Sequence, residues 1–213
     1  MTFLQKLDAN KLFISIFLVL LFHVSAIIGI AIGQGDYFLP LTPLNLLLCF
    51  GLILWNIPQL NLKDLGALAI PFLFGMVAEL LGVNFGLIFG TYEYGANLGP
   101  KIWGVPWIIG VNWSILVFAT ASVAQNISQN KIIRSIIGAV LMVLLDVVIE
   151  KVAPKFDFWE FENGIVPLQN YMGWLVVSFL AHLTFQLVFS KYRYVLGSAL
   201  LLVFLLFFGI FAV

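Results

Sequence analysis

The sequence predicts an all-α integral membrane protein, a bundle of about seven transmembrane helices that form one domain over residues 1–213. Hydrophobic residues make up 62% of the chain and charged residues only 9%, whereas a soluble domain carries roughly 25% charged residues. Too few charged side chains are present to cover a surface that faces water. In addition, seven apolar runs each reach about the 20 residues that a helix needs to cross a bilayer.

Each apolar run is bounded by polar residues, glycine or proline. The runs lack the polar–apolar alternation of barrel strands, so helices are favoured. The boundaries, in chain order, include Lys11 and Gly33, Pro40 and Pro58, Asp64 and Gly90, Pro106, Lys131, Lys151, Tyr171 and Arg193. The predicted spans are 12–32, 40–58, 65–89, 105–125, 132–150, 171–189 and 194–213. Together they leave no room for a soluble domain.

The distribution of Lys and Arg predicts the orientation of the chain in the cell (inner) membrane. With seven spans, the N-terminus and every second loop share one side, and cytoplasmic loops carry the excess of basic residues. The N-terminal side has the larger number of Lys and Arg, which predicts a cytoplasmic N-terminus and an outer C-terminus. The basic residues are Lys6, Lys11, Lys63, Lys131, Arg134, Lys191 and Arg193 on the predicted inner side, against Lys101, Lys151 and Lys155 on the outer side.

Charge and cysteine usage exclude several classes of function. Ten basic and ten acidic residues give a net charge of zero, so no basic surface for nucleic acid is expected. The single cysteine, Cys49, rules out an internal disulfide and any CxxC site. The chain has two histidines, and neither belongs to an HxxxH or HxxE pattern. A histidine-rich metal site is therefore not expected. The sequence therefore predicts no cofactor, no metal and no nucleic-acid partner, but contact with lipid.

Glu79 is the strongest single signal of chemistry. It lies about ten residues before the outer end of the span 65–89, which places it about 15 Å deep at 1.5 Å per residue. A carboxyl at such depth costs about 2.5–3.5 kcal/mol to insert, so it is expected to face the bundle interior. Burial favours the neutral carboxyl, which could donate a proton. A hydrogen bond to a neighbouring helix is the structural alternative.

Asp146 and Glu150 form a second candidate pair. Their i,i+4 spacing places both carboxyls on one face of a helix, and two adjacent carboxyls tend to share one proton. The pair could therefore supply an acid and a base to one site. The alternative is an interfacial pair, because Glu150 precedes Lys151 and Asp146 lies near the end of its span.

The two longest outer loops, 90–104 and 151–170, are rich in aromatic and acidic residues. These side chains could line a cavity, or they could form the aromatic belt found at membrane surfaces. Asparagines within spans could instead bond neighbouring helices. The candidates for substrate binding are Glu93, Tyr94, Trp107, Asn112, Trp113, Asp157, Trp159, Asn170 and Tyr171.

Four segments together resemble a known family. These are FGxxxExxG around Glu79, FGTYEY with LGPKIWGVPW, the LLDxxxE pair, and DFW with VPLQNYxGW. They are similar to the bacterial and archaeal carotenoid-biosynthesis membrane proteins, which include the CruF-type carotenoid 1,2-hydratases. The resemblance covers about residues 65–175. It implies addition of water to the terminal C1–C2 double bond of an acyclic ψ-end, with a substrate of the lycopene or γ-carotene type taken from the bilayer.

This chemistry agrees with the residues themselves. Hydration of an isolated alkene needs an acid, a water and a stabilised cation. Buried carboxyls can supply the acid and base, and aromatic faces can stabilise the cation. We expect Asp146 or Glu79 to be the acid, Glu150 or its pair partner the base, with Tyr94, Trp113 and Trp159 around the end group. A proton-coupled transporter, or a lyase or cyclase acting on the same polyenes, remains an alternative.

Overall fold

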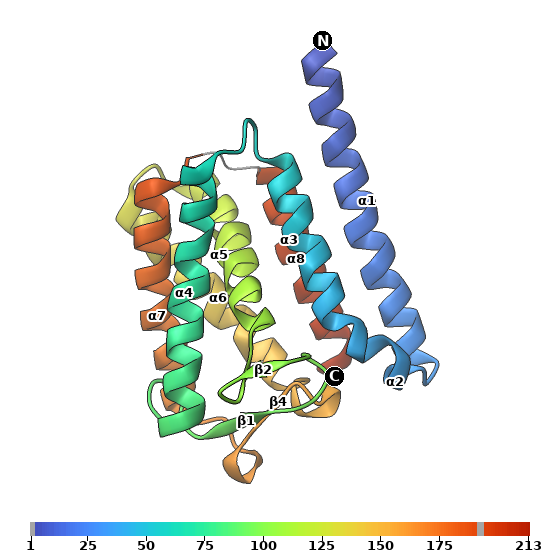
Figure 1. Cartoon of the computed structure of the whole chain (residues 1–213), viewed down its shortest axis with the longest axis vertical. Coiled ribbons are helices and arrows are strands. Elements are labelled where there is room, and N and C mark those ends of the chain that lie inside the picture. The colour runs from blue at the N-terminus through green and yellow to red at the C-terminus, as the bar shows by residue number, and fades with distance from the viewer. Residues whose placement is uncertain (1–2, 191–193) are drawn as a thin grey trace.

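The apolar runs form a bundle of long helices in the computed structural model, which describes residues 3–190 and 194–213 (Figure 1). The predicted all-α membrane fold is confirmed. Lys191 and Arg193, which contribute to the predicted orientation, lie outside the described residues. The long helices are α1 (Phe3–Ala31), α3 (Thr42–Asn56), α4 (Leu62–Phe85), α5 (Ile108–Ile127), α6 (Lys131–Glu150), α7 (Leu168–Val188) and α8 (Tyr194–Phe211).

Six segments within the described residues are long and apolar enough to cross a membrane. The second of them, Gly35–Asn56, combines α2 (Gly35–Phe38), the 3-10 turn Leu39–Leu41 and α3. The last predicted span, 194–213, corresponds to a shorter apolar helix over Val195–Phe211. At 1.5 Å per residue, the 18 residues of α8 (Tyr194–Phe211), which include this segment, give a length of about 27 Å, slightly less than the hydrocarbon core.

Helix α5 lies at the centre of the bundle. It is buried along most of its length and packs against α3, α4, α6 and α8, while α1 lies at the edge (Figure 1). Small residues allow this close packing, as is common between helices in membranes. A Cβ on Gly197 of α8, for example, would overlap the Ser122 side chain of α5.

Helix α4, which carries Glu79, has well-defined ends. At its start, Asn61 and Asp64 form a capping box in which each side chain accepts a 3.1 Å hydrogen bond from the other's backbone N–H. It ends at Gly86, whose φ of +64° is left-handed. The predicted end of this span at 89 is therefore wrong, and Glu79 lies about 9 Å from the helix end instead of about 15 Å.

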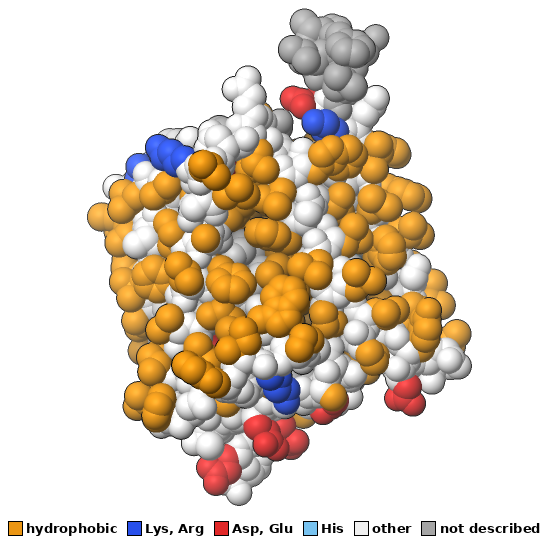
Figure 2. Space-filling view, viewed as in Figure 1, with side chains coloured by type: hydrophobic (Ala, Val, Ile, Leu, Met, Phe, Trp, Pro, Cys, Tyr) orange, Lys and Arg blue, Asp and Glu red, His pale blue; other side chains and the backbone are white. Residues whose placement is uncertain are grey.

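Two small antiparallel sheets cover the end of the bundle that lies opposite the N-terminus (Figure 1). Strand β1 (Tyr92–Tyr94) pairs with β4 (Trp159–Phe161), and β2 (Lys101–Ile102) pairs with β3 (Val105–Pro106). The 3-10 turns Pro154–Phe156 and Glu162–Gly164 flank β4. We call this region, residues 86–107 and 151–167, the cap. Acidic side chains gather at the cap end and basic ones mainly at the other end (Figure 2).

Candidate active site

The candidate site lies where α4, α5, α6 and α7 meet the cap. It is a small chamber with a cavity of about 20 Å³, which is enough for about one water molecule. Four spans and both long outer loops contribute side chains to it, so residues far apart in the sequence face one volume. The lining residues are Glu79, Phe89, Tyr92, Tyr94, Ile109, Asn112, Trp113, Ile149, Glu150, Trp159, Phe161, Asn170 and Trp174.

Glu79 is only 4% exposed and accepts hydrogen bonds from three donors. The Tyr94 hydroxyl donates to Glu79 Oε2 over 2.7 Å, and the Tyr92 hydroxyl donates to the same oxygen. The indole N–H of Trp113 donates to Oε1 over 3.2 Å. Three donors directed at one carboxyl stabilise its ionised form. A phenol can donate a hydrogen bond only while it keeps its proton, so Tyr92 and Tyr94 must both be neutral in this arrangement.

The environment keeps those phenols neutral. Burial raises the pKa of both Tyr92 and Tyr94 above the ordinary value of 10.0, and the nearby Glu79 carboxyl raises it further. Both hydroxyls therefore retain their protons at physiological pH and remain donors. Strand geometry explains why the two act together, because residues two apart in a strand point to the same side.

Asp146 and Glu150 both lie on α6. Asn170 of α7 connects the two carboxyls. The Asn170 amide Nδ2 is 2.8 Å from Asp146 Oδ2 and 3.3 Å from Glu150 Oε1. The indole N–H of Trp159 donates to Glu150 Oε2 over 3.1 Å. Asp146 Oδ1 is buried and has no hydrogen-bond partner among the described residues. Two buried carboxyls this close favour retention of one proton.

Aromatic rings form one wall of the chamber. The indoles of Trp113 and Trp174 stack with centroids 4.6 Å apart at an interplanar angle of 14°. The Phe89 ring lies 6.4 Å from Trp113 and 6.1 Å from Trp174. Gly75 of α4 makes room for this wall, since a Cβ there would overlap the Trp113 indole.

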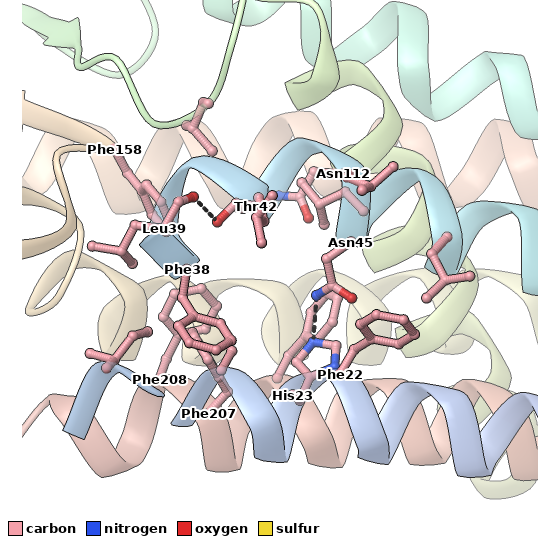
Figure 3. A pocket seen from close by; sticks show the side chains of 18 of the residues that line it. Phe22, His23, Phe38, Leu39, Thr42, Asn45, Asn112, Phe158, Phe207 and Phe208 are labelled. Carbon is pink, nitrogen blue, oxygen red and sulfur yellow. Dashed lines mark hydrogen bonds between the residues drawn. The ribbon is translucent and has the colours of Figure 1, made fainter. Parts of the chain in front are cut away.

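A much larger cavity of about 700 Å³ adjoins the chamber. Ile109, Asn112, Ile149 and Trp159 line both cavities, so only these side chains separate them. The larger cavity lies among α1, α2, α3, α5 and α8 and is lined mainly by apolar side chains. Figure 3 shows Phe38, Phe207 and Phe208 on one part of its wall and Phe22, His23 and Asn45 on another.

Three polar side chains of this larger cavity, His23, Thr42 and Asn45, form hydrogen bonds, whereas the buried side-chain oxygen of Asn45 has no partner among the described residues. His23 Nδ1 lies 2.8 Å from the Val19 carbonyl oxygen, so Nδ1 carries the proton and donates it. His23 Nε2 is then the acceptor for the Asn45 amide at 3.2 Å (Figure 3). The Thr42 hydroxyl likewise donates to the Leu39 carbonyl over 2.7 Å. These pairings leave a predominantly apolar wall.

The structure brings together many of the predicted site residues and separates others. Glu93 is exposed and faces away from the two tyrosines, directly opposite Glu160 on β4. Asp157 is exposed and accepts a 2.8 Å hydrogen bond from the Ala96 backbone N–H within the cap. Trp107 and Tyr171 are half-buried and do not line the chamber. The predicted residues in the cluster are Glu79, Tyr94, Asn112, Trp113, Asp146, Glu150, Trp159 and Asn170.

Sequence reasoning did not single out Phe89 or Trp174 as members of the chamber, and it did not find the larger cavity. It placed Tyr92 only among the loop residues that could line a cavity or form an aromatic belt. The alternation of Tyr92, Glu93 and Tyr94 was a usable signal, since a strand places Glu93 on the side opposite both tyrosines. Trp174 is four residues after Asn170, which places both on one face of α7. No comparable signal marks the larger cavity, because its lining resembles any lipid-facing apolar run.

A metal site would need converging ligands of suitable type. Within residues 3–190 and 194–213, no group of three His, Cys, Asp or Glu side chains is arranged to hold a metal ion. The chemistry that the chamber can perform is proton transfer among carboxyls next to an aromatic wall.

The fold and site define a class: a helical membrane protein with buried carboxyls that open toward an apolar cavity. Residues 42–213 match the family described as "Carotenoid biosynthesis protein", and the chain belongs to this family. It is also similar to the bisanhydrobacterioruberin hydratase of Haloarcula japonica, with 31% identity over 121 residues. This match covers 53% of the chain and 41% of that relative, so the chain spans less than half of the relative's length. No solved structure matches the chain.

Proposed function

We propose that this protein is a carotenoid hydratase, a hydro-lyase that adds water to the terminal C1–C2 double bond of an acyclic ψ-end. One observation carries the proposal: two buried carboxyls, Glu79 and Glu150, and an aromatic wall line a cavity that holds about one water and that adjoins a large apolar cavity. A third buried carboxyl, Asp146, lies behind Glu150. The similarity to a hydratase that is named for a carotenoid supports the same reaction type.

The proton donor in this mechanism is the Asp146–Glu150 pair. Glu150 lines the chamber, whereas Asp146 lies behind it and acts through its neighbours. Asp146 is thus a positioning residue that keeps one proton on the pair, and Glu150 delivers that proton to C2 of the double bond. A new C2–H bond forms from the alkene electron pair, and a tertiary cation is left at C1.

The cation is stabilised by the opposite wall of the chamber. Aromatic faces attract a cation, and Trp113, Trp174 and Phe89 present three rings to the chamber. In this mechanism Glu79 acts as the ionised carboxyl of the site: its three donors stabilise that form, and its negative charge faces the developing cation. A fixed charge placed where the transition state becomes positive lowers the barrier without reorganisation.

Water then captures the cation. Its oxygen bonds to C1, and Glu79 accepts the proton that the water releases. The pair has lost one proton and Glu79 has gained one, so a proton returns to the pair before the next cycle. No electron transfer occurs, and no redox cofactor is needed. The sequence left the acid as Asp146 or Glu79, and the three donors on Glu79 favour the pair as the acid.

For the substrate, we propose an acyclic-ended carotenoid such as lycopene or γ-carotene, drawn from the bilayer. We also propose that the cap faces the outside of the inner membrane and the N-terminus the cytoplasm. The acidic cap end and the basic opposite end support this orientation (Figure 2), in agreement with the positive-inside rule.

The direct test is expression in a lycopene-accumulating host, followed by chromatography and mass spectrometry of the pigments. We expect a product heavier by one water, with the visible chromophore unchanged because the terminal bond is isolated from the conjugated system. A cyclised or eliminated product without added water would instead indicate a lyase or cyclase. Unchanged lycopene and γ-carotene, together with accumulation of a solute in vesicles, would favour a proton-coupled transporter.

A further inference from the structure

The large cavity next to the chamber extends far beyond the reacting carboxyls. On α1 its lining runs from Leu21 to Ile30, a distance of about 14 Å along the helix. It shares Asn112 and Trp159 with the chamber. A molecule in the large cavity can therefore present one end to Glu150 and Glu79 while its remainder contacts mainly apolar side chains.

Part of the lining of this cavity reaches the outer surface of the protein. Several of its lining residues are also exposed on the surface of the protein: Phe22 on α1 is 47% exposed, Tyr37 on α2 66%, and Leu44 on α3 65%. The exposed part of the lining therefore belongs to α1, α2 and α3, and a lateral opening between α1 and α3 would connect the cavity with lipid. Apolar side chains cover the surface around these two helices (Figure 2).

Helix α1 is well placed to border such an opening. In Figure 1 it runs along the edge of the bundle beside α3, and its C-terminal end lies next to α2. There, Phe38 lies directly on Gly29, where a Cβ would overlap the phenyl ring. Phe38 also lines the cavity (Figure 3), so this contact closes the cavity at its end near α2.

The length of the cavity limits how much of a substrate it can enclose. A carotenoid is about as long as the hydrocarbon core is thick, about 30 Å. The lining on α1 covers about 14 Å, or roughly half of that length. The other half must lie outside the cavity, and a lateral opening between α1 and α3 would lead directly into lipid.

We propose that the large cavity is a binding site for the terminal half of a linear polyene, which enters from the bilayer between α1 and α3 while its far half stays in lipid. The identity of the reacting end rests on the proposed hydratase function, but binding itself does not. The site recognises an extended apolar chain, and the chamber recognises its terminal double bond.

Binding can be measured apart from turnover. Lycopene is added to the purified Glu79→Gln variant in nanodiscs, and bound pigment is quantified from its visible absorbance after gel filtration. Two further substitutions are made in that background. Ala26→Phe fills the cavity, because Ala26 lines it, and Leu44→Trp narrows the opening. The matched control is Leu73→Trp, a 59% exposed position on α4 away from the cavity.

We expect both cavity variants to weaken lycopene binding about tenfold, equal to about 1.4 kcal/mol, while Leu73→Trp binds like its parent. Equal binding by all variants would overturn the proposal, and a loss with Ala26→Phe but not with Leu44→Trp would overturn the route of entry. Leu44→Trp lies on the lipid-facing surface, so it tests the site even if Ala26→Phe does not fold.

The outcomes separate the two proposals. If the wild-type protein forms no hydrated product but Glu79→Gln binds lycopene in a manner sensitive to Ala26→Phe, the hydratase function fails and the binding site stands. If the wild-type protein hydrates lycopene but neither cavity variant changes binding or rate, the binding site fails and the hydratase function stands.

Discussion

The side-chain amide of Asn170 donates a 2.8 Å hydrogen bond to Asp146 Oδ2, which joins α7 to α6 at the most deeply buried acid of the site. The same nitrogen reaches Glu150 Oε1 at 3.3 Å. One residue of a neighbouring helix thus positions two carboxyls, and its removal should disturb both at once.

Asn170→Leu is therefore expected to reduce hydration by about 10²-fold, at the lower end of the usual contribution of acid–base groups. It should also lower stability by about 1–3 kcal/mol, since a buried acceptor loses its donor. Product formation per unit of folded protein is the measurement. The adjacent, exposed Gln169→Ala serves as the control, and an undiminished rate in Asn170→Leu would contradict the role of the amide.

Glu79→Gln should abolish most of the hydration, with a loss of about 10²–10⁴-fold. Glutamine retains the shape of the side chain but cannot stabilise a cation with a charge or accept a proton from water. Glu160→Gln, an exposed carboxyl on β4, is the matched control and should retain the wild-type rate. Comparable rates in the two variants would remove Glu79 from the mechanism.

Gly75→Ala should displace the Trp113 indole from Glu79, because the added Cβ overlaps the ring. Gly66→Ala on the same helix meets no atom within 4 Å and should leave the protein unchanged. The measurements are tryptophan fluorescence, thermal midpoint and hydration rate in detergent. Wild-type fluorescence in Gly75→Ala would contradict the predicted displacement, and altered fluorescence with a wild-type rate would show that the indole position is unimportant for hydration.

Alkaline pH should leave Tyr92 and Tyr94 neutral well beyond the range in which tyrosine usually ionises. Burial and the nearby Glu79 carboxyl raise the pKa of both phenols above 10.0 in the folded protein. The stability linked to these groups is therefore present below pH about 10, the unfolded pKa of tyrosine, and falls as the pH rises above it.

Difference spectra of tyrosinate absorbance against pH test this directly. The folded Tyr92→Phe and Tyr94→Phe proteins should show the same tyrosinate signal as the wild type until the protein unfolds. A smaller signal in either variant, before unfolding, would show that the phenol ionises in the folded state.

The orientation can be tested by labelling intact cells with a membrane-impermeant maleimide. Glu162→Cys in the cap should be labelled, while Lys63→Cys at the opposite end should be labelled only after the cells are permeabilised. Both positions are exposed, and native Cys49 is fully buried. The reverse pattern would place the cap, and the site beneath it, on the cytoplasmic side.

Composition and local spacing determined much of this protein. The scarcity of charge and the long apolar runs predicted the helical membrane fold, because a bilayer admits few other structures. A carboxyl far inside a span has few stable environments, which identified Glu79 as a residue that faces the interior. The i,i+4 spacing likewise identified Asp146 and Glu150 as neighbours, since helix geometry alone fixes that relationship.

Only the tertiary structure decided which outer-loop residues contact those acids, and that a large cavity lies beside the site. The turn at Gly86 and the pairing of β1 with β4 direct Tyr92 and Tyr94 to Glu79 and turn Glu93 away. These contacts connect residues that are distant in the sequence, so no local pattern specifies them. The large cavity is likewise a space between α1, α3, α5 and α8. Apolar side chains that line a cavity and those that face lipid obey the same preference for hydrocarbon, so only their packing distinguishes them.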